Sequence, residues 1–166
     1  MIGHNGSISK VKVDSRNVAI SAAYDSTLLV WQLDTLECAQ GLFKGHKDAV
    51  MEFEWNNSLC VSGDRSGGLT WWDINTGTPI KTQMVHSGGV SKIALPSTGD
   101  SNLIVSSGLK DGSLSVFDMR THKVVMKEKV CGGAINLLEI SDQGQIVCGA
   151  SDSSVKVFDI GNSKPI

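Results

Sequence analysis

The sequence predicts an all-β chain built from four repeats, and three observations indicate this. A closing aromatic residue, usually followed by Asp, recurs roughly every forty to forty-five residues: Trp31, Trp72, Phe117 and Phe158. Each unit also opens with a histidine or, in the last unit, a cysteine: His4, His46, His86 and Cys131. No segment shows helical periodicity, and Gly, Ser and Asn mark turns between short β-rich runs. The chain is therefore expected to form the same small β-sheet four times.

The first strand of each unit carries a recurring apolar pattern. Counted from the opening residue, apolar side chains stand at positions +4, +7 and +9: Ile8, Val11, Val13; Val50, Phe53, Trp55; Val90, Ile93, Leu95; Ile135, Leu138, Ile140. A step of three followed by a step of two breaks the alternation of a regular strand. The pattern predicts a strand with a β-bulge near +5 or +6.

The strand before each closing aromatic alternates regularly, with apolar residues three and one positions earlier: Leu28, Val30; Leu69, Trp71; Leu114, Val116; Val155, Val157. Further β-rich runs, such as 17–23 and 103–107, lie between these two strands. The third unit is longer because 96–102 adds a polar loop between its first two strands.

Composition excludes several classes of function. The chain has 166 residues, a net charge of −2 and an isoelectric point near 6.0, so no global field attracts nucleic acid or anionic membrane. No apolar run is long enough for a membrane helix, and the residues after Met1 do not form a secretory signal. The four cysteines have no CxxC spacing, which argues against a zinc or redox motif. We expect an intracellular protein, cytoplasmic or nuclear, without a metal or cofactor.

The repeated Gly-His to Trp-Asp frame is similar to that of the WD40 β-propeller family, and the resemblance covers nearly the whole chain. It implies one WD40 region over 1–166, with repeats at about 1–44, 45–84, 85–130 and 131–166. Each repeat would form a four-stranded antiparallel blade, the last lacking most of its outer strand. The family usually closes seven blades, so we expect an incomplete ring. The favoured explanation is a segment of a longer chain; a ring completed by another polypeptide or a second copy, and a strained four-blade ring, remain alternatives.

In the family, a histidine, a Ser or Thr, an Asp and the closing Trp form a hydrogen-bonded tetrad. The first unit carries the full set, which is His4, Ser21, Asp25 and Trp31. The second has His46, Ser62 and Trp72 with Ser66 in the Asp position; the third has His86, Ser107 and Asp111 with Phe117 in the Trp position. Because the set recurs, we interpret it as structural rather than catalytic.

The fourth unit departs most from the tetrad, with Cys131, Cys148, Asp152 and Phe158. Phe158 has no indole donor, and the two thiols replace the groups that would accept from one. We expect an apolar cluster in which both thiols lie close together, more often an inert pair than a regulatory disulfide, while Asp152 still binds backbone amides in its turn.

Function is expected on the propeller face that carries the connections between units and the turn before each closing strand. Positions carried over from the family are Ser9, Tyr24, Met51, Arg65, Ser91, Lys110, Asn136 and Ser151. Tyr24, Met51 and Arg65 are the expected hot spots, and with Lys110 they would favour an acidic or phosphorylated segment. The resemblance thus implies a non-catalytic scaffold that binds proteins or peptides.

Three other classes of function have some support in the sequence. Phe117, Asp118 and Arg120 are similar to the aromatic-Asp-x-Arg box of WD40 substrate receptors that dock on the adaptor of cullin-4 ubiquitin ligases; alternatively, Arg120 pairs with Asp118 or a neighbouring blade. An enzyme would have only His122 and the cysteines as spare chemistry, without catalytic spacing. Nucleic-acid binding has only the interrupted basic run 123–129 in its favour.

Overall fold

Four four-stranded antiparallel sheets make up the computed structural model, which describes residues 3–35, 37–56, 59–96, 102–141, 144–159 and 162–165. The side chains of 37–43 and 162–165 lie outside this description, as does the loop at 97–101 and therefore most of the polar loop expected at 96–102. None of the described segments is a helix long and apolar enough to cross a bilayer.

Each sheet is a meander in which neighbouring strands in the chain pair in order. The first sheet is β1 (Ile8–Val13), β2 (Val18–Ala23), β3 (Thr27–Gln32) and β4 (Glu37–Lys44). The second is β5 (Val50–Asn56), β6 (Leu59–Asp64), β7 (Gly68–Asp73) and β8 (Thr78–Met84). The third is β9 (Val90–Ala94), β10 (Leu103–Gly108), β11 (Ser113–Asp118) and β12 (Lys123–Lys129). The fourth is β13 (Ile135–Ile140), β14 (Gln145–Ala150), β15 (Val155–Asp159) and the short β16 (Asn162–Pro165). The predicted all-β fold is confirmed, and we call the four sheets blades 1 to 4.

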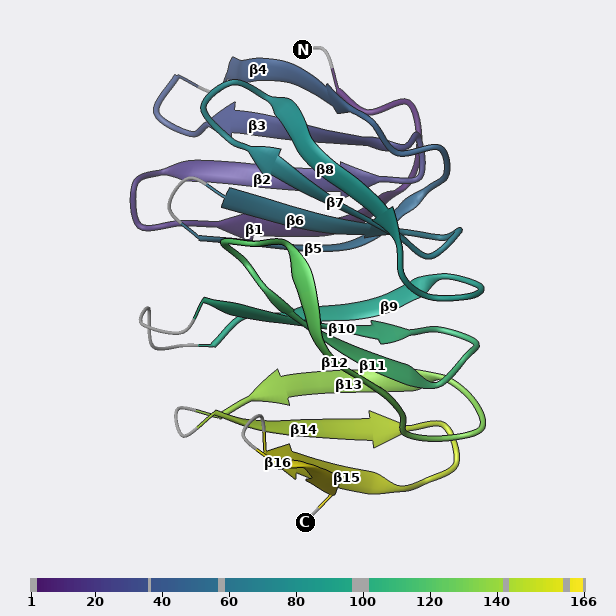
Figure 1. Cartoon of the computed structure of the whole chain (residues 1–166). Coiled ribbons are helices and arrows are strands. Elements are labelled where there is room, and N and C mark those ends of the chain that lie inside the picture. Colours follow the sequence, from purple (N-terminus) through teal and green to yellow (C-terminus); the bar gives the residue numbers. More distant parts are fainter. Residues whose placement is uncertain are drawn as a thin grey trace.

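The blades follow one another in an open array (Figure 1). The first strand of each blade lies innermost, with β5 beside β1 and β9, and β9 beside β13. Blade 1 and blade 4 lie at opposite ends of the array, so the four blades do not close into a ring (Figure 1).

The predicted bulge is present in the first strand of every blade. The register of each inner strand shifts around its +5 residue, which is left out of the regular pairing with the second strand. These residues are Ser9, Met51, Ser91 and Asn136. The extra residue brings the apolar +4 and +7 side chains onto the same face of the strand, because side chains otherwise alternate.

That face forms the core between blades. Val50, Phe53 and Trp55 of blade 2 cluster with Ile20, Leu28 and Val30 of blade 1, and all six are buried. Two equivalent clusters join blade 2 to blade 3 and blade 3 to blade 4. The apolar pattern read from the sequence is therefore the pattern that stacks the blades.

Candidate interaction face and the polar tetrads behind it

The tetrad of blade 1 forms a continuous hydrogen-bonded chain. The Trp31 indole donates to Ser21 Oγ at 2.8 Å, and Ser21 Oγ lies 2.7 Å from His4 Nε2. His4 Nδ1 is 3.2 Å from Asp25 Oδ2. Because the carboxylate can only accept, Nδ1 carries the proton and Nε2 accepts from the serine hydroxyl. The Asp therefore fixes the tautomer that the serine requires.

Blade 2 has the same hydrogen-bonded chain, but its acid comes from a different position than the spacing predicts. Asp64 Oδ2 is 2.8 Å from His46 Nδ1, whereas Ser66 donates its hydroxyl to Asp64 Oδ1 at 2.6 Å. The expectation that Ser66 replaces the acid is thus wrong. Asp64 stands two residues earlier in the chain and reaches the same histidine from the end of β6. Burial alone raises the pKa of Asp64. The hydrogen bonds from His46, Ser66 and Gly68 together lower it by more than burial raises it, so the pKa lies below its ordinary value.

In blade 3 the serine of the tetrad is Ser106, not Ser107 as the spacing indicated. Ser106 Oγ is 2.8 Å from His86 Nε2, while Ser107 Oγ lies 2.9 Å from Ser91 Oγ. The turn after β10 is one residue longer than its counterparts, because Ser106 pairs with Ser115 whereas Ser62 pairs with Thr70. Counting back a fixed distance from the closing aromatic therefore selects the wrong serine.

Asp111 reaches His86 through a relay. The Ser113 hydroxyl donates to Asp111 Oδ1 at 2.8 Å, and its oxygen lies 2.7 Å from His86 Nδ1. Burial lowers the pKa of His86 to about 4, although the nearby Asp111 raises it. The imidazole is therefore neutral at physiological pH.

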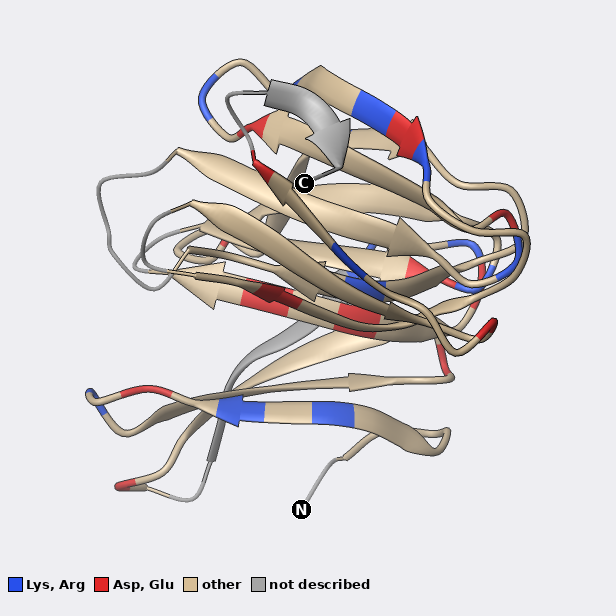
Figure 2. Cartoon of the chain, turned by 90° about the horizontal axis from the view of Figure 1, so that it is seen from below, with Lys and Arg blue, Asp and Glu red and all other residues tan. Residues whose placement is uncertain are grey.

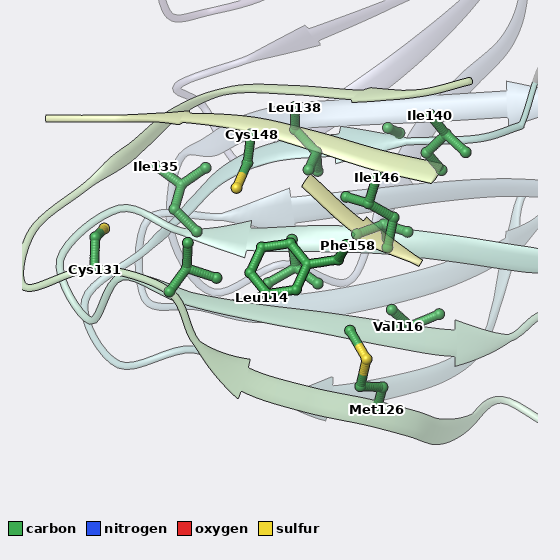
Figure 3. Packing of buried hydrophobic residues seen from close by; sticks show 13 residues of the cluster. Leu114, Val116, Met126, Cys131, Ile135, Leu138, Ile140, Ile146, Cys148 and Phe158 are labelled. Atoms are coloured by element: carbon green, nitrogen blue, oxygen red, sulfur yellow. The ribbon is translucent and has the colours of Figure 1, made fainter. Parts of the chain in front are cut away.

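Blade 4 replaces the polar chain with an apolar cluster. Cys131, Cys148 and Phe158 are buried among Ile135, Leu138 and other side chains of the same cluster (Figure 3). Both thiols are free and donate to backbone carbonyls, Cys131 to Gly133 and Cys148 to Lys156. Burial, and to a smaller extent Cys131, raises the pKa of the Cys148 thiol. Asp152 accepts from the backbone N–H of Ser154 at 3.0 Å, within its turn.

The expected interaction face lies at one end of the blades, where the connections into the inner strands meet the turns between second and third strands. In all four blades one backbone bond joins these two loops: the N–H of Tyr24, Arg65, Leu109 and Ser151 donates to the carbonyl of Ser7, Ala49, Gly89 and Ala134, respectively. In blade 3 the equivalent of Tyr24 and Arg65 is thus Leu109. Lys110 is one residue further along the lengthened turn; it is exposed and lies against Gly88.

Two predicted hot spots meet on this face. The Arg65 guanidinium lies over the Tyr24 ring, 5.1 Å from its centroid, and joins the turns of blades 1 and 2. Both side chains are exposed, and no carboxylate among the described residues pairs with Arg65. Met51, half-buried, is the bulge residue at the start of β5 beside these turns.

The other face residues differ in their freedom to bind. Ser9 Oγ donates to the Ala22 carbonyl and Ser91 Oγ to the Ser107 carbonyl, so both hydroxyls are engaged within their own blades. Asn136 and Ser151 are exposed. Tyr24, Arg65 and Lys110 are therefore the face residues with the longest exposed polar ends.

Arg120 of the aromatic-Asp-x-Arg box lies at the opposite end of blade 3, in the turn between β11 and β12. Its guanidinium is 3.5 Å from Asp118 Oδ2, while Phe117 is fully buried. Of the two interpretations of Arg120, the structure thus displays the pairing with Asp118. Within the described ranges, no three His, Cys, Asp or Glu side chains gather closely enough to hold a metal ion.

Comparisons with known proteins agree with this architecture. The family model of the WD domain, G-beta repeat, matches residues 77–118. Autophagy-related protein 16 of Arabidopsis thaliana is 30% identical over 96% of this chain and 32% of its own length. Pre-mRNA-splicing factor cwf17 of Schizosaccharomyces pombe is 25% identical over 98% of this chain and 48% of its own. Ribosome biogenesis protein YTM1 of Coprinopsis cinerea is 26% identical over 95% of this chain and 36% of its own length. The chain thus spans less than half the length of each of these relatives.

Proposed function

Because the chain belongs to the WD40-repeat family, we propose that it is a non-catalytic scaffold that binds protein segments on the loop face defined by Tyr24, Met51, Arg65 and Lys110. The relatives named above belong to autophagy, splicing and ribosome biogenesis by their names, which supports a role in assembling other proteins inside the cell, in cytoplasm or nucleus. No cofactor or nucleic acid is part of the proposal.

The stack of Arg65 on Tyr24 is the observation that carries this proposal. An aromatic platform holds the guanidinium in one orientation, so less side-chain entropy is lost when a partner binds. Its N–H groups then present a planar fork that matches a carboxylate or phosphate. The preferred partner is therefore an acidic or phosphorylated protein segment, with Met51 and Tyr24 supplying apolar contact beside the charge.

The experiment is an array of degenerate decapeptides with a fixed central Glu, phosphoserine, Lys or Ser. The chain should bind the Glu or phosphoserine peptides above the Lys and Ser peptides, and Arg65→Ala should weaken that binding by about tenfold, which corresponds to roughly 1.4 kcal/mol. Arg120→Ala is the matched control, because Arg120 is an exposed arginine at the opposite end of a blade. Equal binding by the Arg65 and Arg120 variants would refute the assignment of the face.

Adaptor docking through Phe117, Asp118 and Arg120 is not proposed as a second function. Arg120 is already paired with Asp118, and no observation beyond the box itself supports docking. The Arg120→Ala control tests this idea as well, if the purified adaptor is added as a binding partner.

A further inference from the structure

The outer strands β8 and β12 form the rim of blades 2 and 3, which both have a neighbouring blade on either side. Each is the last strand of its sheet, so its outer edge pairs with no other described strand. Two lysines tie this rim together: Lys81 Nζ donates to the His122 carbonyl and Lys127 Nζ to the Val85 carbonyl, both at 2.7 Å. The two bonds run in opposite directions, so each blade positions an ammonium group that comes from the other.

The strand register shows which side chains of β12 point toward blade 2. Directly opposed residues of an antiparallel pair point to the same side of the sheet. On β12 and β11 these pairs are Val124 with Phe117, Lys127 with Ser115, and Lys129 with Ser113. Phe117 packs against Trp71 of blade 2, with ring centroids 5.4 Å apart, so this side of β12 faces blade 2. Lys81 lies opposite Trp71 on blade 2, and we call Lys81, Val124, Lys127 and Lys129 the rim patch.

The rim patch carries positive charge that is not neutralised within the described part of the chain. Lys127 and Lys129 are exposed and Lys81 is half-buried, and none of the three forms an ion pair with a described carboxylate. The backbone carbonyls that Lys81 and Lys127 contact leave the charge of the ammonium groups in place. β8 contains no acid, and Glu128 of β12 lies opposite Leu114, on the side away from blade 2. Figure 2 shows lysines in blue and acidic residues in red.

These charges decide which kind of strand can add to the rim. A second copy of β12 is unsuitable, because its lysines would lie against those of the first. An acidic strand is favoured, because its carboxylates lie opposite the lysines, and Val124, which is 43% exposed, offers an apolar contact beside them. β12 is the better edge, because it carries two of the three lysines and no proline, whereas β8 contains Pro79, which has no N–H to donate.

We propose that an acidic protein segment adds to the outer edge of β12 as a further strand, with its carboxylates on the side that faces blade 2. Side chains two residues apart on one face of a strand are about 7 Å apart, both in β12 and in the added strand. Acids at alternate positions of the partner therefore match Lys127 and Lys129. Main-chain hydrogen bonds supply affinity and the lysines supply specificity. This surface is separate from the loop face that contains Arg65.

The test uses capped octapeptides in which Glu alternates with Val, or Lys alternates with Val. All measurements use an Arg65→Ala background, so that the loop face contributes little to the binding of acidic peptides. The Glu peptide should bind, shift the backbone amide signals of 126–129 in NMR spectra and slow their hydrogen exchange, whereas the Lys peptide should do neither. A Glu peptide with its central valines replaced by proline keeps its charges but cannot form a regular strand, and it should not bind.

Lys129→Glu and Lys123→Glu form a matched pair of variants. Both reverse the charge of an exposed lysine on β12, but Lys123 lies opposite Asp118 and points away from blade 2. Lys129→Glu should weaken binding of the Glu peptide by about fivefold, and Lys123→Glu by much less; circular dichroism checks that both remain folded. Equal losses in the two variants, binding that survives the proline replacements, or no binding at all would overturn the inference. Vesicles containing phosphatidylserine that bind where the Glu peptide does not would assign the rim patch to a membrane surface instead.

Discussion

Ser62→Ala is predicted to destabilise blade 2 more than the equivalent change destabilises blade 3. Ser62 is fully buried and serves two partners, since it accepts from the Trp72 indole at 2.7 Å and lies 2.5 Å from His46 Nε2. Alanine would remove the hydroxyl that both of these buried groups bind. Each lost hydrogen bond to a buried group costs about 1–3 kcal/mol, so the expected loss in free energy of unfolding is about 2–6 kcal/mol.

Ser106→Ala is the matched comparison in blade 3. Ser106 is also fully buried, but among the described residues its hydroxyl bonds only His86, because Phe117 supplies no indole donor. The expected loss is about 1–3 kcal/mol. The difference between the two variants therefore measures the single hydrogen bond from the indole.

Urea denaturation followed by tryptophan fluorescence and circular dichroism gives both free energies. A double-mutant cycle with Trp72→Phe sharpens the comparison, because Ser62→Ala should cost no more than Ser106→Ala when the indole N–H is absent. Equal losses for the two single variants, or additive losses in the cycle, would refute the claim that the indole is coupled to the histidine through this serine.

Three further predictions concern stability. The free energy of unfolding should decrease as pH falls from about 6.5 to about 4, because burial lowers the pKa of His86 to about 4 and the unfolded chain therefore binds the proton first. When the free energy of unfolding in urea is measured at a series of pH values, His86→Gln should make it less dependent on pH in this range. Gly67→Ala should destabilise the chain much more than Gly144→Ala in thermal unfolding. Both glycines have positive φ, but an added methyl group at Gly67 overlaps the carbonyl of His86, whereas one at Gly144 faces open space. Similar melting temperatures for the two variants would contradict this reasoning. Glu52→Gln should cost about 1–3 kcal/mol in urea unfolding, because Lys10 and Lys92 lose the carboxylate they share, and a neutral result would show that solvent replaces the pairing.

The sequence predicted those features that depend on local spacing. The three-then-two steps among apolar residues reflect a real bulge, because a strand must shift by one residue to place +4 and +7 on the same face. The wrong assignments of Ser66 and Ser107 have two different causes. The turn after β10 has an extra residue, so the usual spacing to the closing aromatic selects Ser107 instead of Ser106. The turn after β6 has the ordinary length, but the acid of blade 2 is Asp64, which stands two residues before the position that the family pattern indicates.

Features that join blades could not be located from one repeat at a time. Glu52 does not stand out in the sequence, because its partners Lys10 and Lys92 lie about forty residues away on either side and each alone is an ordinary polar strand position. A comparison of the +6 positions across units, which are Lys10, Glu52, Lys92 and Leu137, would have revealed alternating charge. The sequence indicates Arg65 and Tyr24 as hot spots, but only the fold shows that they stack.

The tetrads and the interaction face are separable, although they share the same loops. The hydrogen-bonded tetrad is complete in blade 1, lacks the indole in blade 3, and lacks the hydroxyl and the imidazole as well in blade 4. The backbone bond between the two loops of the face nevertheless persists in every blade, as in Ser151 to Ala134 of blade 4. The position of the face residues is therefore set by the meander and its bulge, while the tetrads contribute stability. A variant such as Ser62→Ala, studied where it remains folded, should lower the resistance to urea without changing which peptide Arg65 selects.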